Sequence, residues 1–357
     1  MDRGHHATSR GAGSNLTMDD YFALSPDEQR GYCELASAQI KLDAPSIEKD
    51  FWVCWILRET FLLPKTGTHL TFKGGTSLSK GWKLIQRFSE DIDVVIAREF
   101  LGFGGDKEPE AADSRKQREA RLEELRDACR AYVQNVLTGE LRERLQSRLP
   151  KHIDWRLEND PNDPDQQSLL FVYPSAFSRG AYLNPQVKLE FCARSDTEPS
   201  ARPIIQPYLA EALPGELKDA SFPVHTVAPE RTFWEKAMLL HEENYSTKPK
   251  PNPRMARHYY DVWCLLGAGV GEKAVASPGL FETVAHHRAI FFRKKKEAQD
   301  SLQPGTLAIL PREDRRAAWE QDYEAMQAAM FFGPVPSFAE ILGAVGEFEN
   351  RFNKKSR

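Results

Sequence analysis

The sequence predicts an α+β protein, with a small mixed sheet and flanking helices in its first half and a helical second half. Apolar residues recur at three- and four-residue steps over most of the 357 residues, which is typical of helices. Short alternating or β-branched runs, which are typical of strands, are concentrated between residues 69 and 192. The two patterns together predict a sheet-containing domain followed by a helical domain.

The first half contains the strands that form the predicted sheet. Its predicted elements are, in order, a disordered tail rich in Gly, Ser and His (1–18), helices (19–63), a strand (69–72), a helix after a glycine pair (76–85), a strand (91–96), a long amphipathic helix (109–149) and three strands (153–157, 169–173 and 183–192). We expect these strands to form one sheet, and we assign residues 19–200 to an α/β domain.

Helical spacing dominates the second half. Pro229 is expected near the start of the first of these helices, a position that suits proline. We place the domain boundary within 195–228 and assign residues 224–357 to a helical domain. The predicted helices span 233–243, 258–266, 279–297, 313–332 and 337–352.

Composition limits the classes of function. The chain carries 48 Lys and Arg against 52 Asp and Glu, a formal net charge of −4 at pH 7, so any polyanion must be bound by a local patch. No apolar run reaches the roughly 18 residues that a membrane helix needs, and the N-terminal segment lacks the apolar core of a signal peptide. We therefore expect a cytoplasmic protein without a membrane span, whose five separated cysteines are reduced thiols.

A glycine pair follows the first predicted strand of the sheet, in the run Lys73, Gly74, Gly75, Thr76 and Ser77. Glycines at a strand-to-helix turn let backbone N–H groups approach a triphosphate, and the helix N-terminus adds favourable partial charge. We expect Lys73 and a hydroxyl of Thr76 or Ser77 to donate further hydrogen bonds. The run is not a Walker A loop, because Gly-Lys-Ser/Thr does not occur at the required spacing.

Three carboxylates are predicted to lie on neighbouring strands. Asp91 and Asp93 are two residues apart on a strand, so both project to one side, and Glu190 belongs to the later strand 183–192. Carboxylate oxygens suit hard divalent cations, so we expect Mg²⁺ or Mn²⁺ at these residues. Taken alone, Asp-x-Asp is equally well explained as an exposed strand start. Beside a phosphate-binding turn, the three carboxylates predict two-metal phosphoryl or nucleotidyl transfer.

The glycine pair, the Asp-x-Asp motif and the later carboxylate resemble the nucleotidyltransferase superfamily of the DNA polymerase β kind. Within it, the sequence of residues 73–78 and 87–93 resembles the AbiEii/AbiGii family of bacterial toxins. The resemblance extends over most of the chain, through residues 48–58, 233–241 and 257–265. It implies a polymerase β-like nucleotidyltransferase domain and a helical domain that completes the active site.

The resemblance also implies roles for Lys236 and Asp261 in catalysis and nucleotide binding. A lysine near a triphosphate neutralises developing charge, and an acidic partner can orient it. The alternative is structural, because both residues lie on predicted helices whose other faces are apolar. On that interpretation they are charges at the edge of a helix–helix contact.

One dense basic cluster lies near the end of a predicted helix. It has two interpretations, a solvated helix face or a contact with RNA phosphates. The residues in question are Arg288, Arg293, Lys294, Lys295 and Lys296.

The sequence thus predicts a metal-dependent toxin that transfers a nucleotidyl group from an NTP to an acceptor, with RNA such as tRNA favoured. We expect it to act in a toxin–antitoxin or phage-defence system, with a cognate antitoxin as a possible partner. Nucleotidylation of a protein or small-molecule hydroxyl stays open. So does a non-catalytic module that binds NTP or antitoxin, although clustered, mutually repelling carboxylates without a metal argue against it.

Overall fold

The computed structural model describes residues 16–40, 42–177, 184–292, 295–331, 333 and 335–355. Residues 1–15 of the predicted tail lie outside this range. The prediction is wrong for the last three residues of the tail, because β1 (Leu16–Thr17) pairs with β9 (Leu217–Lys218) and Met18 is fully buried. Pairing and burial therefore fix the chain from Leu16 onward.

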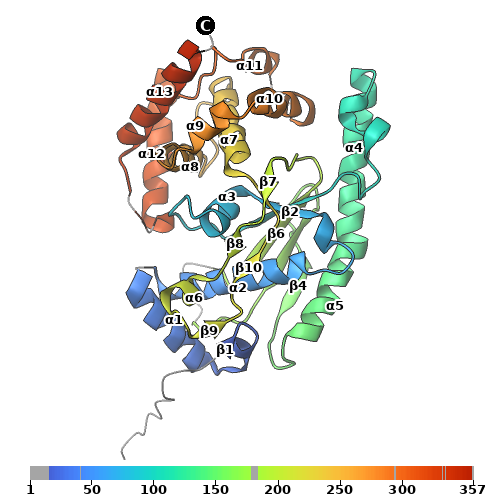
Figure 1. Cartoon of the computed structure of the whole chain (residues 1–357), viewed down its shortest axis with the longest axis vertical. Helices are drawn as coiled ribbons and strands as arrows, with labels where there is room; N and C mark the ends of the chain where they lie inside the picture. The colour runs from blue at the N-terminus through green and yellow to red at the C-terminus, as the bar shows by residue number, and fades with distance from the viewer. Residues whose placement is uncertain are drawn as a thin grey trace, which may run out of the picture.

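A seven-stranded sheet lies at the centre of the molecule (Figure 1). β3 runs parallel to β6 and β11 runs parallel to β2, whereas the other neighbours are antiparallel. In spatial order the strands are β4 (Arg156–Asn159), β5 (Ser168–Val172), β6 (Gln186–Cys192), β3 (Ile92–Ile96), β2 (Leu70–Lys73), β11 (Thr226–Val227) and β7 (Ser200–Ala201). A separate pair joins β8 (Ile204–Ile205) and β10 (Phe222–Pro223).

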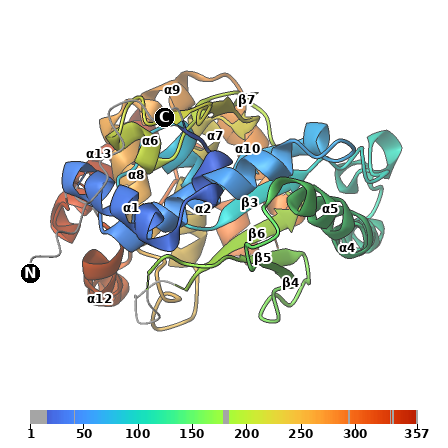
Figure 2. The same ribbon diagram turned by 90° about the horizontal axis from the view of Figure 1, so that it is seen from below.

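Helices of the first half lie below the sheet and along one side of it (Figures 1 and 2). Short helical turns are η1 (Asp20–Ala23), η2 (Gly67–His69), η4 (Gly105–Lys107) and η5 (Pro109–Ala111). The longer elements are α1 (Pro26–Ile40), α2 (Ala44–Phe61), α3 (Gly74–Thr76) with the π-helical turn η3 (Ser77–Gly81), and α4 (Arg115–Tyr132), which continues through the π-helical turn η6 (Val133–Leu137) into α5 (Thr138–Arg148).

The second half is almost entirely helical and lies above the sheet in Figure 1. After α6 (Tyr208–Ala212), its helices are α7 (Pro229–Asn244), α8 (Arg257–Gly267), α9 (Val270–Ala276), α10 (Leu280–Phe291), α11 (Lys296–Asp300), α12 (Glu313–Met330) and α13 (Phe338–Lys355).

The α+β class and all five predicted strands of the sheet are confirmed, with ends that shift by a few residues. The predicted helix 76–85 is wrong beyond Gly81, where the chain leaves the helix and becomes irregular. The predicted helix 279–297 is interrupted, because α10 ends at Phe291 and α11 begins at Lys296. β7 and β11 were not predicted, since two-residue strands carry too short a pattern.

Strand alternation gives the sheet two different faces. In β6, Val187, Leu189 and Phe191 are buried among apolar side chains, while Lys188 and Glu190 project from the other face. The apolar face is covered by α2, where Trp52 lies 5.0 Å from Tyr173 between ring centroids, and by the arm of α4 and α5. The polar face is turned toward the C-terminal helices, and it carries the candidate site.

Two apolar clusters form the core, one around the sheet and one among the C-terminal helices. They do not follow the predicted domain ranges strictly. Leu78 and Ile85 of the first half pack in the helical cluster, and Ile290 and Phe291 of the second half pack in the sheet cluster. The domain division stays a prediction, because each half contributes to the core of the other.

Helices in the described part of the chain are too short or too polar to cross a membrane. The five cysteines, Cys33, Cys54, Cys129, Cys192 and Cys264, are free thiols, as predicted, and three of them are buried.

Candidate active site

The glycine pair forms a tight turn against a carboxylate. β2 ends at Lys73, and Gly74 adopts a φ of +81°, a conformation that suits glycine. A Cβ atom at Gly74 would overlap the carboxylate of Asp93, so only glycine lets the turn approach this group. A Cβ at Gly75 would lie 2.8 Å from the Ser89 Oγ. The turn therefore leaves its backbone directly beside the predicted metal ligands.

Charged residues form a row across three neighbouring strands. In the register of the sheet, Lys73 of β2 lies opposite Asp93 of β3, and Asp93 lies opposite Glu190 of β6. Their side chains share the polar face, as strand alternation requires. Asp91 immediately precedes β3 and lines the same cavity as Asp93 and Glu190. The predicted grouping of the three carboxylates is thus present.

The carboxylates of this row carry excess negative charge. Burial, followed by the charges of Glu190 and Glu90, raises the pKa of Asp91. Burial and Glu190 likewise raise the pKa of Asp93 to about 7, although Lys73 acts in the opposite direction. Two buried acids that are hard to ionise indicate that the neighbouring cations do not balance them.

A second group of charges joins the helices to the segment before β3. Asp261 of α8 accepts two hydrogen bonds from Arg87, at 2.7 and 2.8 Å, and forms an ion pair with Lys236 of α7 at 2.8 Å. Burial alone would raise the pKa of Asp261, but Arg87 and Lys236 outweigh it and hold the pKa well below its ordinary value. Lys236 and Asp261 are therefore in direct contact, and Asp261 fixes two cations at once.

Lys73 connects the sheet to α7. Its Nζ donates to Ser195 Oγ at 3.0 Å and to Glu235 Oε2 at 3.3 Å. Glu235 also forms an ion pair with Arg231 at 3.2 Å. Burial alone would raise the pKa of Glu235, but Lys73 and Arg231 lower it below its ordinary value. The lysine of the glycine turn is thus held in place by the neighbouring helix.

These groups converge on one cavity of about 310 Å³, which is within the roughly 300–1,000 Å³ range of small-molecule sites. Strand and turn residues line one wall and α7, α8 and α10 line the other. Predicted site residues that line it are Lys73, Gly74, Gly75, Asp91, Asp93, Glu190, Lys236 and Arg288. Asp261 lies behind this wall, fully buried.

The carboxylates suit a divalent metal in donor chemistry but are not yet arranged as ligands. Among the residues that the structure describes, no group of three or more His, Cys, Asp and Glu side chains is placed to hold a metal ion as it stands. Glu190 forms an ion pair with Lys188, which also pairs with Asp160 at 3.2 Å. Oxygen donors on adjacent strands nevertheless match the preference of Mg²⁺ and Mn²⁺.

The prediction that Thr76 or Ser77 binds phosphate is not supported. Both side chains are fully buried. Thr76 Oγ1 donates to the Asp91 carbonyl at 2.5 Å, and Ser77 Oγ donates to the Gly74 carbonyl at 2.9 Å. The hydroxyls therefore hold the turn and the Asp91 segment together. The hydroxyl-bearing residues that line the cavity are Ser89, Ser195 and Thr232, which the sequence analysis did not select.

The predicted RNA-binding cluster is divided by the structure. Arg288 is 6% exposed and makes two hydrogen bonds to Glu242, at 2.8 and 2.6 Å, so its assignment to an exposed RNA-binding surface is wrong. Lys295 and Lys296 are exposed. Arg293 and Lys294 lie outside the described residues.

The cavity is also lined by several residues that the sequence analysis did not select. Arg87 and Ser89 belong to the same motif as Asp91, and their spacing of two is the signal that places them on its side. Arg257 and His258 begin the helix that carries Asp261. His258 Nδ1 lies 3.4 Å from Lys236 Nζ, and burial, followed by the charge of Lys236, keeps its pKa well below the ordinary value.

The chain is similar to proteins of one known family. The family described as "Nucleotidyl transferase AbiEii toxin, Type IV TA system" matches residues 55–344. Among solved structures, the chain is similar to MenT4, a nucleotidyltransferase toxin from Mycobacterium tuberculosis H37Rv, with a TM-score of 0.40 and 16% sequence identity over 91% of this chain and 97% of that one. A search of curated proteins finds no match.

Proposed function

Because the chain belongs to the AbiEii family of nucleotidyltransferase toxins of type IV toxin–antitoxin systems, we propose that it transfers a nucleotidyl group from an NTP to RNA, such as tRNA. One observation carries the proposal. The glycine turn, three carboxylates and the cations Lys73 and Lys236 border a single cavity. Phosphoryl-transfer sites need this combination, since catalysis there is mostly positioning and charge stabilisation.

The turn and the cations bind the triphosphate. Gly74 and Gly75 line the cavity, where backbone N–H groups of the turn would meet phosphate oxygens, and Lys73 lies at the edge of the turn. Arg87, from the segment before β3, adds positive charge beside the turn, and Lys236 of α7 adds it from the opposite wall. Asp261 acts indirectly, because it orients both of these cations from behind the wall. An NTP would then be neutralised from two sides.

Asp91, Asp93 and Glu190 would hold Mg²⁺ or Mn²⁺. A bound divalent cation supplies charge neutralisation of the phosphates and activation of the acceptor hydroxyl. The raised pKa values of Asp91 and Asp93 favour a cation in place of protons. Glu190 would have to leave Lys188 to join them, which makes Lys188 a competitor for the same carboxylate.

The proposed transfer is a substitution at the α-phosphorus of the NTP. The acceptor oxygen forms a bond to the α-phosphorus, and the bond from that phosphorus to the pyrophosphate oxygen breaks, with its electron pair leaving on pyrophosphate. The hydroxyl proton passes to a carboxylate of the site.

RNA is proposed as the acceptor because exposed cations, Lys295 and Lys296, lie beyond α10, whose residues line the cavity. A protein or small-molecule hydroxyl is the second candidate, since the same transfer chemistry applies to any hydroxyl. The family also implies an antitoxin as a partner.

The test is to incubate the protein with each α-labelled NTP, Mg²⁺ or Mn²⁺, and total RNA, and to identify the labelled species. We expect label in RNA, dependence on the metal, and no label with Asp93→Asn. Label in protein or in a small molecule would show that the acceptor belongs to the second class and not to RNA. No labelled product with any NTP would contradict the proposed activity.

A further inference from the structure

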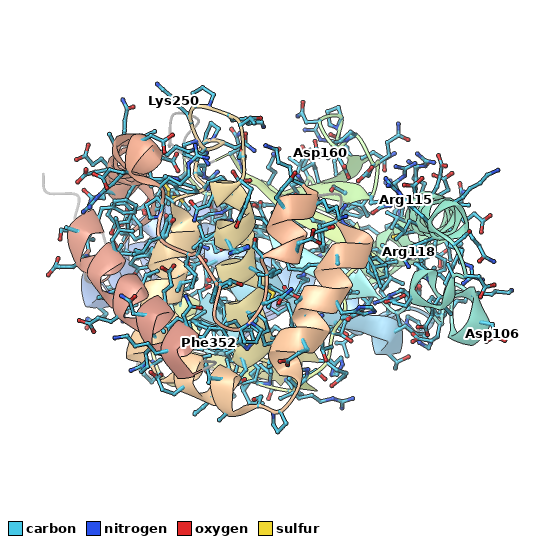
Figure 3. The ribbon with its side chains drawn as sticks, turned by 90° about the horizontal axis from the view of Figure 1, so that it is seen from above. Asp106, Arg115, Arg118, Asp160, Lys250 and Phe352 are labelled. Carbon is cyan, nitrogen blue, oxygen red and sulfur yellow. The ribbon has the colours of Figure 1, made fainter. Side chains whose placement is uncertain are left out.

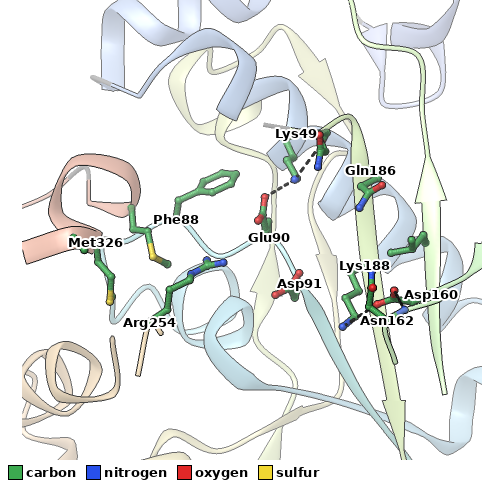
Figure 4. A pocket seen from close by; sticks show the side chains of 14 residues that line it. Lys49, Phe88, Glu90, Asp91, Asp160, Asn162, Gln186, Lys188, Arg254 and Met326 are labelled. Atoms are coloured by element: carbon green, nitrogen blue, oxygen red, sulfur yellow. Dashed lines mark hydrogen bonds and ion pairs between the residues drawn. The ribbon is translucent and has the colours of Figure 1, made fainter. Parts of the chain in front are cut away.

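A second cavity, of about 440 Å³, lies against the segment that leads into β3 (Figure 4). Its walls come from α2, β5, β6, the loops before β5 and β6, the segment before α8, and α12. The lining side chains are Lys49, Phe88, Glu90, Asp91, Asp160, Asn162, Leu170, Asn184, Gln186, Lys188, Arg254, Ala325, Met326 and Met330. Nothing in the proposed NTP-binding role uses these residues other than Asp91.

Residues 87–91 form a partition between the two cavities. Arg87 and Ser89 line the first cavity, whereas Phe88 and Glu90 line the second. Among the described residues, Asp91 lines both. A group transfer brings its acceptor to the reacting phosphate from the side opposite the leaving group, so an acceptor site is expected across the catalytic carboxylates from the triphosphate. The second cavity has this position.

We propose that the second cavity binds the 3′-terminal nucleoside of the RNA acceptor, an inference that rests on the proposed function. The lining chemistry favours a nucleoside over an aliphatic or peptidic hydroxyl. Phe88 presents an aromatic ring to the cavity, and Met326, on the same side in Figure 4, and Met330 add apolar thioether side chains to its lining. Bases of single-stranded RNA are bound by stacking on such apolar faces.

Side-chain amides provide hydrogen-bonding groups for a base edge. Asn162, Asn184 and Gln186 line the cavity, and Figure 4 shows Asn162 and Gln186 on the side away from Phe88 and Met326. Each amide carries donors and an acceptor, which match the mixed donors and acceptors of a base. A cavity built only for a metal or for phosphate would instead be expected to present charges of one sign.

Arg254 is the cation available to an RNA phosphate. Lys49 forms an ion pair with Glu90, and Lys188 forms ion pairs with Asp160 and Glu190. Arg254 is exposed, and among the described residues the structure gives its guanidinium no ion-pair partner. Its side chain extends toward Glu90 and Asp91 in Figure 4.

The backbone at Arg254 is held in an uncommon conformation. Arg254 has a φ of +65°, and the carboxylate of Asp322 accepts hydrogen bonds from the N–H groups of Arg254 and Ala256, at 2.7 and 2.8 Å. Non-glycine residues in this region are strained and are often found at ligand sites. Asp322 of α12 thus anchors the arginine at the mouth of the cavity.

The test compares two RNA oligonucleotides that share a single-stranded 3′ end, one of which lacks its terminal base but keeps its terminal hydroxyl. We expect the wild type to prefer the intact oligonucleotide by about tenfold in kcat/KM, the scale of one stacked base. Arg254→Asn, which keeps a residue tolerant of positive φ, should raise the KM for RNA several-fold. Gln186→Ala should reduce the preference for the terminal base. NTP affinity should not change in either variant.

The matched control is Arg351→Asn. Arg351 is an exposed arginine of α13 that forms an ion pair with Glu272. Its neighbour Phe352 lies on the opposite side of the molecule from Asp160 of the cavity (Figure 3). Labelling of RNA with equal efficiency for both oligonucleotides, or an unchanged KM in both cavity variants, would overturn the inference and leave the proposed function standing. If the wild type labels no RNA, the proposed function fails, and the inference fails with it.

Discussion

The two walls of the proposed NTP cavity differ in how their charges are balanced. On the sheet wall, Asp91 and Asp93 have raised pKa values, because burial and neighbouring carboxylates oppose their ionisation. Asp261 of the helical wall is buried more deeply but is held ionised by Lys236 of α7 and by Arg87 of the segment before β3. The carboxylates of the sheet wall therefore need a cation from outside the chain, whereas Asp261 has its cations within the chain. The difference separates residues that are expected to bind a cation, Asp91 and Asp93, from Asp261, which positions cations of the chain.

Removing a carboxylate from the sheet wall should abolish activity and improve stability. Asp91→Asn and Asp93→Asn are each expected to lower transfer a hundredfold or more, on the order of 3 kcal/mol in the transition state. The raised pKa of Asp93 means that its ionisation weakens the fold as the pH rises through about 7. Urea unfolding at pH 8 should thus show Asp93→Asn at least as stable as the wild type. A folded variant with near wild-type turnover would contradict the metal assignment.

Glu190 provides a matched comparison on the same wall. Glu190→Gln is expected to lose transfer like the aspartate variants, because its carboxylate lies opposite Asp93 in the sheet. Glu198→Gln is the control, since Glu198 is exposed and its carboxylate accepts a hydrogen bond from Ser200 at 2.8 Å. Equal activities of the two variants, measured with the labelled-NTP assay, would remove Glu190 from the site.

On the helical wall, the same kind of change should destabilise the protein. Asp261→Ala leaves Arg87 and Lys236 buried without their partner, which is expected to cost about 3–5 kcal/mol of unfolding free energy. Lys236→Ala leaves the pair of Arg87 and Asp261 intact, so it should cost less stability while weakening NTP binding about tenfold. The double variant should be little worse than Asp261→Ala alone. Additive losses in NTP affinity, or unchanged catalysis in Lys236→Ala, would show that this wall is only structural.

Lowering the pH should remove the stability that Asp261 contributes, the opposite of the pH dependence expected for Asp93. The pKa of Asp261 is lowered by folding, so its contribution to stability is full above its unfolded value of about 3.9 and is lost as the pH falls below it. The difference in unfolding free energy between wild type and Asp261→Asn should therefore shrink as the pH falls below about 4. A difference that stays constant from pH 7 to pH 3 would contradict the proposed pairing.

The smallest effect is expected outside both walls. The double change Lys295→Ala and Lys296→Ala removes two exposed charges and should weaken RNA binding a few-fold, with a shallower dependence on salt. NTP affinity should be unchanged. Filter binding at two salt concentrations measures both quantities. An unchanged salt dependence would assign these lysines to a solvated helix face.

Local patterns predicted the sheet wall well. The glycine pair, the alternation of Asp91 and Asp93, and the strand that carries Glu190 are all short-range signals. Lys236 and Asp261 came from family resemblance; the structure places them in contact at 2.8 Å, and their roles stay a prediction. The sequence was enough to identify these residues, because one motif or one element defines each of them.

What the sequence could not provide depends on distant partners. Arg87 and Asp261 are 174 residues apart, and no periodicity links them. Thr76 and Ser77 looked suited to phosphate, but their hydroxyls are used by nearby carbonyls, a competition that only the packed turn reveals. Arg288 belonged to a basic run, yet tertiary packing buries it against Glu242. In each case the partner, and not the residue type, decides the role.

The partition between the cavities is tied to the end of α12. The N–H of Phe88 donates to the Met330 carbonyl at 2.6 Å, Arg87 forms a β-bridge with Phe331, and the N–H of Gly333 donates to the Gln86 carbonyl at 3.3 Å. A ribosome releases the chain from its N-terminus, so a nascent chain carries Asp91, Glu190 and Asp261 well before the residues that hold the partition. We expect such unfinished chains to be inactive. A cell would then meet the active toxin only after residues 330–333 have been synthesised.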